Sequence, residues 1–183
     1  MVALLVSDSL TVQSHKGLYT VSFDDNALSK LNAHVPENVH FIIDQSVARL
    51  YRNEMEVVLS TPSVLLIEAL ERNKSLDKFP KYIQHLVKHR VRRNQFLVAI
   101  GGGIIQDITC FLAATLLRGI PWKFYPTTLL AQADSCIGSK SSINSGNAKN
   151  ILGTFTPPNQ VCVATTFLDT LNELDLRSGI GEM

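Results

Sequence analysis

The sequence has few cysteines, almost no net charge and no long apolar run, and each shortage narrows the class of protein. Cys110, Cys136 and Cys162 lie far apart without a CxxC pair, which indicates reduced thiols rather than a disulfide framework. Lys and Arg number 17 against 16 Asp and Glu, so no global field favours nucleic acid or an anionic membrane as a partner. No stretch approaches the roughly 18 apolar residues of a membrane span, and the N-terminal stretch MVALLVSDSL lacks the basic flank of a signal peptide. We therefore expect a cytoplasmic protein that binds neither nucleic acid nor a membrane.

The alternation of element types predicts the fold class. With 183 residues, 45% of them hydrophobic, the chain can bury a sizeable core in one domain, or in one domain and the beginning of a second. Pro80 and the helical spacing of Tyr82, Ile83, Leu86 and Val87 predict a helix over about 80–90. Strands and helices in alternation indicate an α/β fold with a Rossmann-like, mostly parallel sheet and flanking helices. Short runs rich in β-branched and aromatic residues predict strands at 3–7, 18–23, 39–44, 56–60, 95–100 and 122–126.

The stretch GIIQDITCFLAATLLRGI, residues 103–120, is apolar nearly all round. A helix of this kind is buried on every side. We expect the sheet to cover one face of it and another domain or subunit to cover the other.

Three consecutive glycines, Gly101, Gly102 and Gly103, follow the predicted strand at 95–100 and begin this helix. Such a turn presents bare backbone N–H groups at a helix N-terminus, where the pyrophosphate of a dinucleotide binds in doubly wound folds. The run is GGG and not GxGxxG, so a tight turn without a ligand stays an alternative.

The long segment 125–158 is rich in polar groups and contains glycines that permit sharp turns. Lysines and amides gathered on such loops suit a phosphorylated, polyhydroxylated substrate. A solvated loop is the alternative, although long loops in compact domains are usually functional.

The motifs GGGIIQDITCFLAATLLRGIPWKFYPTTLLAQADSCIGSK, KNILGTFTPP and LRSGIGEM closely resemble 3-dehydroquinate synthase and its relatives, the sugar phosphate cyclases. The similarity is dense from about Gln95 onward and is traceable upstream through IIDQSVARLY and ERNKSL. The resemblance implies an NAD-binding domain over 1–172 and the start of a C-terminal helical, metal-binding domain over 173–183.

The resemblance also implies roles for individual residues. Arg118 matches an arginine that reaches the substrate phosphate of the neighbouring subunit in a homodimer, and Glu182 matches a ligand of a catalytic divalent metal, zinc or cobalt. The implied catalytic residues are Lys140, Asp134, Asn150 and Arg118. The implied NAD contacts are Asp44, Glu71, Lys74, Gly102, Gly103, Asp107, Thr127, Thr128, Asp134, Lys140, Lys149, Phe167 and Thr170.

In the family, NAD and the metal transiently oxidise a ring hydroxyl, phosphate leaves, the hydride returns and an aldol step closes a carbocycle. The implied reaction converts 3-deoxy-D-arabino-heptulosonate 7-phosphate to 3-dehydroquinate in the shikimate pathway. Several positions depart from the family pattern: Gln106, Ser139 and Leu70 stand where glycine is usual, and Ser46 stands where asparagine is usual. A cyclase that uses sedoheptulose 7-phosphate or glucose 6-phosphate is therefore the first alternative.

Glu182 lies one residue before the end of the sequence, and one carboxylate cannot supply the about three protein ligands of a catalytic zinc. None of the five histidines matches a family ligand position. We therefore expect this chain to be inactive alone, as part of a longer cyclase. Two other hypotheses stay open: a non-catalytic NAD-binding module and, third, a relative of the iron-dependent alcohol dehydrogenases.

Overall fold

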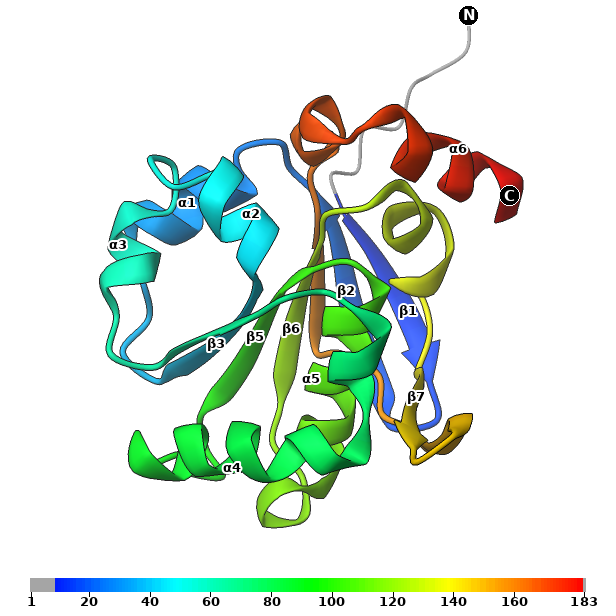
Figure 1. Ribbon diagram of the computed structural model, residues 1–183. Coiled ribbons are helices and arrows are strands. Elements are labelled where there is room, and N and C mark those ends of the chain that lie inside the picture. The colour runs from blue at the N-terminus through cyan, green and yellow to red at the C-terminus, as the bar shows by residue number, and fades with distance from the viewer. Residues whose placement is uncertain (1–8, 183) are drawn as a thin grey trace, which may run out of the picture.

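The computed structural model describes residues 9–182 and contains a seven-stranded sheet with the strand order β1-β2-β9-β6-β5-β3-β4 (Figure 1). β1 and β2 pair antiparallel, and the other pairings in this sheet are parallel. The predicted mostly parallel α/β sheet is confirmed. The strands are β1 (Ser9–Ser14), β2 (Gly17–Phe23), β3 (Val39–Asp44), β4 (Val64–Ile67), β5 (Phe96–Gly101), β6 (Trp122–Pro126) and β9 (Gln160–Val163).

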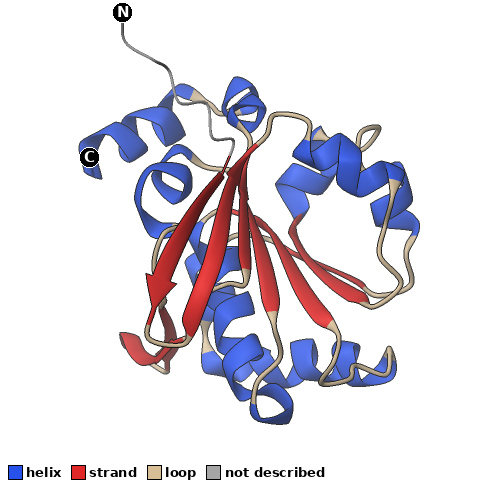
Figure 2. Ribbon diagram, turned by 180° about the vertical axis from the view of Figure 1, so that it is seen from behind, coloured by secondary structure: helices blue, strands red, loops and turns tan. Residues whose placement is uncertain are grey.

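Helices cover both faces of the sheet (Figures 1 and 2). On one face α1 (Ala27–Ala33), α2 (Gln45–Leu50) and α3 (Glu56–Ser60) pack on alternate residues of β3 and β5. On the other face α4 (Phe79–Lys88) and α5 (Gly103–Thr115) pack on the intervening residues. A fully buried β3 residue, Phe41, faces the first group and its neighbour Ile42 faces the second, as the two-residue period of a strand requires.

The bounds of most predicted strands lie within one residue of the observed bounds, and one predicted strand is wrong. The segment 56–60, predicted as a strand from its valines, is the helix α3. The side-chain oxygen of Asn32 accepts hydrogen bonds from the backbone N–H groups of Val57 and Val58, at 2.9 and 3.1 Å. This cap comes from α1 and overrides the β-propensity of the segment. The predicted strand at 3–7 lies outside the described residues.

The apolar helix α5 is covered from within the chain. Phe111 packs edge-on against Phe79 of α4, with ring centroids 5.0 Å apart. The hairpin of β7 (Lys140–Ser145) and β8 (Ala148–Phe155) lies beside the same helix, and the thiol of Cys110 donates to the carbonyl of Thr156. The expectation that another domain or subunit covers this face is therefore wrong. None of the helices between residues 9 and 182 is both long and apolar enough to cross a membrane.

α5 is shorter than the predicted 103–120. After Thr115 the chain makes a single 3₁₀ turn, η3 (Leu116–Arg118). Leu117 and Arg118 have φ values of 50° and 66°, in the left-handed region, and Gly119 follows with φ 119°. Left-handed conformations cannot continue a right-handed helix, so the helix ends here. The last helix, α6 (Glu173–Glu182), begins where the predicted domain boundary lies.

Candidate cofactor site

The carboxyl ends of β3 and β5 lie side by side, at the edge of the sheet where ligands bind in folds of this class. Ile43 of β3 pairs with Ile100 of β5, so the next residues, Asp44 and Gly101, end the two strands side by side. From β3 the chain turns into α2 on one face, and from β5 it turns into α5 on the other. Adjacent strands whose connections leave to opposite faces define the point where ligands bind in open α/β sheets.

The three glycines that follow β5 differ in what a side chain at each position would meet. A Cβ added to Gly101 would lie 2.6 Å from Ile105 Cγ1, and one added to Gly102 would lie 2.8 Å from Thr128 Cγ2. Packing of the chain itself therefore requires both. A Cβ on Gly103 would meet no atom of the described chain within 4 Å. Gly103 thus leaves open space at the N-terminus of α5, where backbone N–H groups are unpaired by the helix.

Asp44 and the two threonines flank this helix N-terminus. The Asp44 carboxylate caps α2 by accepting from the backbone N–H of Ser46 at 2.8 Å, and burial raises the pKa of this carboxyl. The backbone N–H of Thr127 donates to the carbonyl of Gly101 at 3.0 Å, and Thr128 packs its methyl group on Gly102. The predicted residues Asp44, Gly102, Gly103, Thr127 and Thr128 are therefore brought together.

Buried Lys74 joins two further predicted residues, Asp107 and Asn150. Lys74 follows β4 in the 3₁₀ turn η1 (Glu71–Lys74), and 8% of its side chain is exposed. Its ammonium donates to Asp107 Oδ2 at 3.0 Å and to Asn150 Oδ1 at 2.9 Å. The other carboxylate oxygen of Asp107 accepts from the backbone N–H of Ser142 at 3.0 Å. Burial raises the pKa of Asp107 and the nearby Lys74 charge opposes that rise.

Asn144 extends this network to the start of η1. Its amide nitrogen donates to Glu71 Oε1 at 2.8 Å and its oxygen accepts from the backbone N–H of Asn150. The hydrogen bond from Asn144 is the main cause of the lowered pKa of Glu71. Asn150 has φ 52°, a left-handed conformation that asparagine tolerates better than most residues. The network fastens the β7–β8 hairpin to α5 and η1.

A cavity of about 420 Å³ lies beside this network and is lined by Asp107, Lys140, Ser142 and Asn150, among others. Lys140 and Lys149 are exposed on the hairpin, so their ammonium groups are available to an anion. Ser142 was not predicted as a site residue. Its backbone contact to Asp107, 35 residues away, leaves no signal in sequence.

Asp134 lies in the π-helical turn η4 (Ala131–Ser135), which follows Thr127 and Thr128. π-turns are rare and often occur at functional sites. Phe167 and Thr170 lie in η5 (Thr165–Thr170), directly after β9. Tyr51 contacts Phe167 and Thr170. Its ring lies edge-on to the buried ring of Phe167, with centroids 5.1 Å apart, and its hydroxyl lies 2.9 Å from Thr170 Oγ1.

The structure does not bring Arg118 into this group. Arg118 follows the C-terminus of α5, so the length of this 13-residue helix, about 20 Å, separates it from Gly103. Glu182 lies in α6, and its side chain is outside the part of the chain that the structure describes. Among the described residues, no group of three or more His, Cys, Asp or Glu could hold a metal ion.

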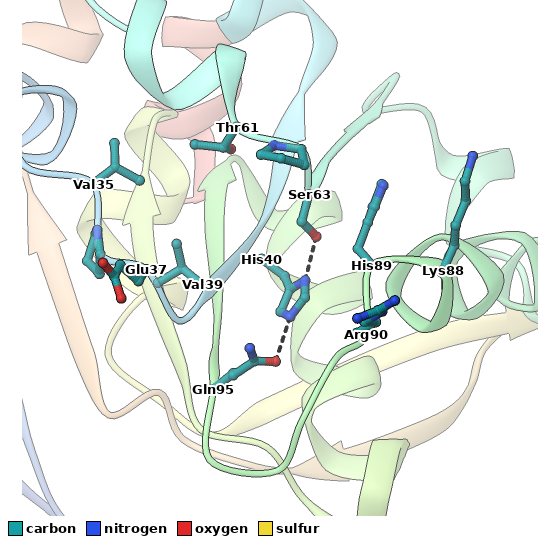
Figure 3. A pocket seen from close by; sticks show the side chains of 12 residues that line it. Val35, Glu37, Val39, His40, Thr61, Ser63, Lys88, His89, Arg90 and Gln95 are labelled. Carbon is teal, nitrogen blue, oxygen red and sulfur yellow. Dashed lines mark hydrogen bonds between the residues drawn. The ribbon is translucent and has the colours of Figure 1, made fainter.

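A second cavity, of about 530 Å³, lies at the opposite, amino-terminal edge of the sheet (Figure 3). Buried His40 is hydrogen-bonded on both ring nitrogens, to the Ser63 hydroxyl and to Gln95 Oε1. Gln95 Oε1 also accepts from the backbone N–H of Arg92, which identifies this atom as the amide oxygen. An amide oxygen cannot donate, so it accepts from His40 Nε2–H. Nδ1 is therefore the acceptor for Ser63. These bonds tie β3 to the loops before β4 and β5 and need no ligand.

Comparison with known proteins decides the family. The family model described as "3-dehydroquinate synthase N-terminal" matches residues 64–178 of this chain. The chain belongs to the 3-dehydroquinate synthase family. It is 34% identical over 184 residues to the 3-dehydroquinate synthase of Enterococcus faecalis (strain ATCC 47077 / OG1RF), covering 96% of this chain and 51% of that protein. The chain thus spans about half the length of the curated relatives it matches.

Solved structures agree with this family. The chain matches the 2-epi-5-epi-valiolone synthase ValA of Streptomyces hygroscopicus subsp. jinggangensis 5008, solved with NAD+ and Zn2+, with a TM-score of 0.78 and 28% identity over 90% of this chain and 48% of that one. A 2-deoxy-scyllo-inosose synthase, solved with carbaglucose-6-phosphate, NAD+ and Co2+, matches with a TM-score of 0.80 over 95% of this chain and 49% of that one. At 22% identity the second match supports the fold alone.

Proposed function

We propose that this chain is the NAD-binding part of a sugar phosphate cyclase. The observation that carries the proposal is Gly103: it opens the N-terminus of α5 at the sheet's switch point, beside Asp44, without any packing reason of its own. Backbone N–H groups at a helix N-terminus bind phosphate. Membership of the 3-dehydroquinate synthase family supplies the reaction class.

The residues present fit NAD. The backbone of Gly102 and Gly103 would hold the pyrophosphate, and the Asp44 carboxylate, at an adjacent strand end, would accept from a ribose hydroxyl. Further proposed contacts come from the ion-paired group of Lys74 with Glu71 and Asp107, in which Asp107 belongs to α5. When bound, NAD would supply hydride-transfer chemistry.

Substrate anions would be held by Lys140 and Lys149. Both ammonium groups lie on the β7–β8 hairpin, whose position is fixed by the contacts of Asp107 with Ser142 and of Lys74 with Asn150. Exposed cations on a braced hairpin can bind a phosphate and a carboxylate without a large rearrangement.

The metal is a weaker fit, since no described group of side chains could hold it. Glu182 stays a proposed ligand that would need partners from elsewhere. A homodimer in which Arg118 contacts the neighbour's substrate, and a location in the cytoplasm, are likewise proposals. Exposure of Arg118 at the end of α5 is compatible with such a contact.

For the substrate we propose 3-deoxy-D-arabino-heptulosonate 7-phosphate, converted to 3-dehydroquinate and phosphate. The 34% identity to the Enterococcus faecalis 3-dehydroquinate synthase, over 96% of this chain, supports this choice. The alternative is another sugar phosphate, which is favoured by the departures at Gln106 and Ser139 and by the similarity to a valiolone synthase.

A chimera tests the proposal. This chain would replace the matching half of the Enterococcus faecalis 3-dehydroquinate synthase, and phosphate release would be measured with NAD+, zinc and each candidate sugar phosphate. Turnover of the heptulosonate is expected, and this chain alone should release no phosphate. Turnover of sedoheptulose 7-phosphate or glucose 6-phosphate alone would overturn the substrate, and a folded chimera that neither binds NAD+ nor turns over would overturn the function.

A further inference from the structure

A buried glutamine connects the glycine turn to the π-turn. Gln106 lies in the first turn of α5 and is 6% exposed. Its amide nitrogen donates to the backbone carbonyl of Ser135 at 2.6 Å, and its amide oxygen accepts from the Ser135 hydroxyl at 2.7 Å. Both ends of one side-chain amide are therefore satisfied by a single residue 29 positions away.

The two partners stand next to the groups that the proposed function uses. Gln106 precedes Asp107 and its backbone N–H donates to the carbonyl of Gly102. Ser135 follows Asp134 and ends the π-turn η4. The pair therefore links the turn that carries Asp134 to the first turn of α5.

Several hydrogen bonds hold the end of the π-turn. The Ile137 N–H donates to the Asp134 carbonyl at 3.3 Å, the Cys136 thiol donates to the Gln132 carbonyl at 3.3 Å, and Gln106 binds Ser135 from outside the turn. The five-residue period of the turn is seen in the bond from the Cys136 N–H to the Ala131 carbonyl. The Ser135 carbonyl comes too late in the turn for such a bond within it, and the Gln106 amide supplies the donor.

We infer that Gln106 is a positioning residue that acts through Asp134. By holding η4 against the first turn of α5, it fixes where the Asp134 carboxylate stands relative to NAD bound at Gly103. The inference rests on the proposed function, because it concerns the geometry of that cofactor site.

A double-mutant cycle on NAD+ affinity tests the inference. Gln106→Ala should weaken NAD+ binding about tenfold, within the usual coupling range for contacting residues. In an Asp134→Ala background the same change should have little further effect, because the residue through which it acts is gone. Ser135→Ala should reproduce part of the loss.

Asn32→Ala is the matched control. It removes two side-chain-to-backbone hydrogen bonds on the opposite face of the sheet, so it should lower the melting temperature without changing NAD+ affinity. Where Gln106→Ala fails to fold, Gln106→Glu keeps the shape and the bond from the Ser135 hydroxyl but lacks the amide donor.

The outcomes separate the two ideas. If the unmodified chain binds no NAD+, the proposed function is wrong and this inference fails with it. If the unmodified chain binds NAD+ and Gln106→Ala binds equally well, only the inference is wrong. An equal loss in the presence and absence of Asp134 would show a general structural role and would also overturn it.

Discussion

The Lys74 ammonium lies 3.0 Å from Asp107 Oδ2 and 2.9 Å from Asn150 Oδ1, with 8% of the lysine side chain exposed. Three residues implied as cofactor or substrate contacts therefore satisfy one another. The charge of the lysine is paired and hydrogen-bonded, which offsets the cost of burying it. The same contacts hold the β7–β8 hairpin against α5.

Lys74→Met should lower the free energy of unfolding by about 2–4 kcal/mol, because it leaves the Asp107 carboxylate without its cationic partner. The loss is expected at or just below that for breaking a fully buried ion pair, because the Asp107 side chain is partly exposed. Denaturant unfolding measures the change. The exposed Lys140 on the same hairpin is the control: Lys140→Met should change stability by no more than about 0.5 kcal/mol. Equal losses in the two variants would contradict the buried-pair account.

Asp44→Ser separates the capping role of Asp44 from its proposed ribose contact. Serine is also a good N-cap, so α2 and the melting temperature should be almost unaffected. The hydrogen bond between a carboxylate and a ribose hydroxyl would be lost, and NAD+ affinity should fall about 10- to 100-fold, the equivalent of roughly 1.5–3 kcal/mol. Calorimetric titration measures this, and unchanged affinity in a folded variant would remove Asp44 from the site.

The buried His40 should make stability depend on pH. Burial is the main cause of the lowered pKa of His40, so the folded state binds this proton more weakly than the unfolded state does. Stability is then fully present above the unfolded pKa of about 6.5 and declines as pH falls from there toward the folded pKa. For one proton the slope is at most about 1.4 kcal/mol per pH unit.

Unfolding by urea at pH 7.5 and at pH 6 checks this prediction. His40→Gln should reduce the loss of stability between the two values, although His85, whose pKa is also lowered by burial, keeps part of it. Asp44 and Asp107 have raised pKa values and act in the opposite direction, chiefly at lower pH. A variant at exposed His34, His34→Gln, is the control. An unchanged slope in His40→Gln would contradict the assignment.

The sequence was informative where local chemistry decides structure. β-Branched and aromatic runs indicated β3, β5 and β6, and Pro80 followed by apolar residues at helical spacing indicated α4. It failed at α3, whose cap comes from Asn32, 25 residues earlier. It also left the segment 140–155 as loops, because β8 is exposed along nearly all of its length and shows no apolar alternation.

The sequence predicted which residues belong to the site, but it did not predict which of them contact one another. The resemblance implied Lys74, Asp107 and Asn150, but their contacts join positions 33 and 76 apart in the chain, which only the fold brings together. Gln106 stood out in sequence only as a departure from glycine. Its role as a donor to Ser135 became visible with the packing of η4 on α5.

The central claim, that the N-terminus of α5 holds the pyrophosphate of NAD, is tested most directly by calorimetric titration of NAD+ into this chain and into Gly103→Ala. The added methyl group meets no atom of the described protein, so the variant should fold with an unchanged or slightly higher melting temperature. It would instead occupy the space of the ligand, and affinity should fall about tenfold or more, as expected from roughly 1–3 kcal/mol of steric conflict. Equal NAD+ affinity in the two proteins, or no binding to the unmodified chain, would contradict the claim.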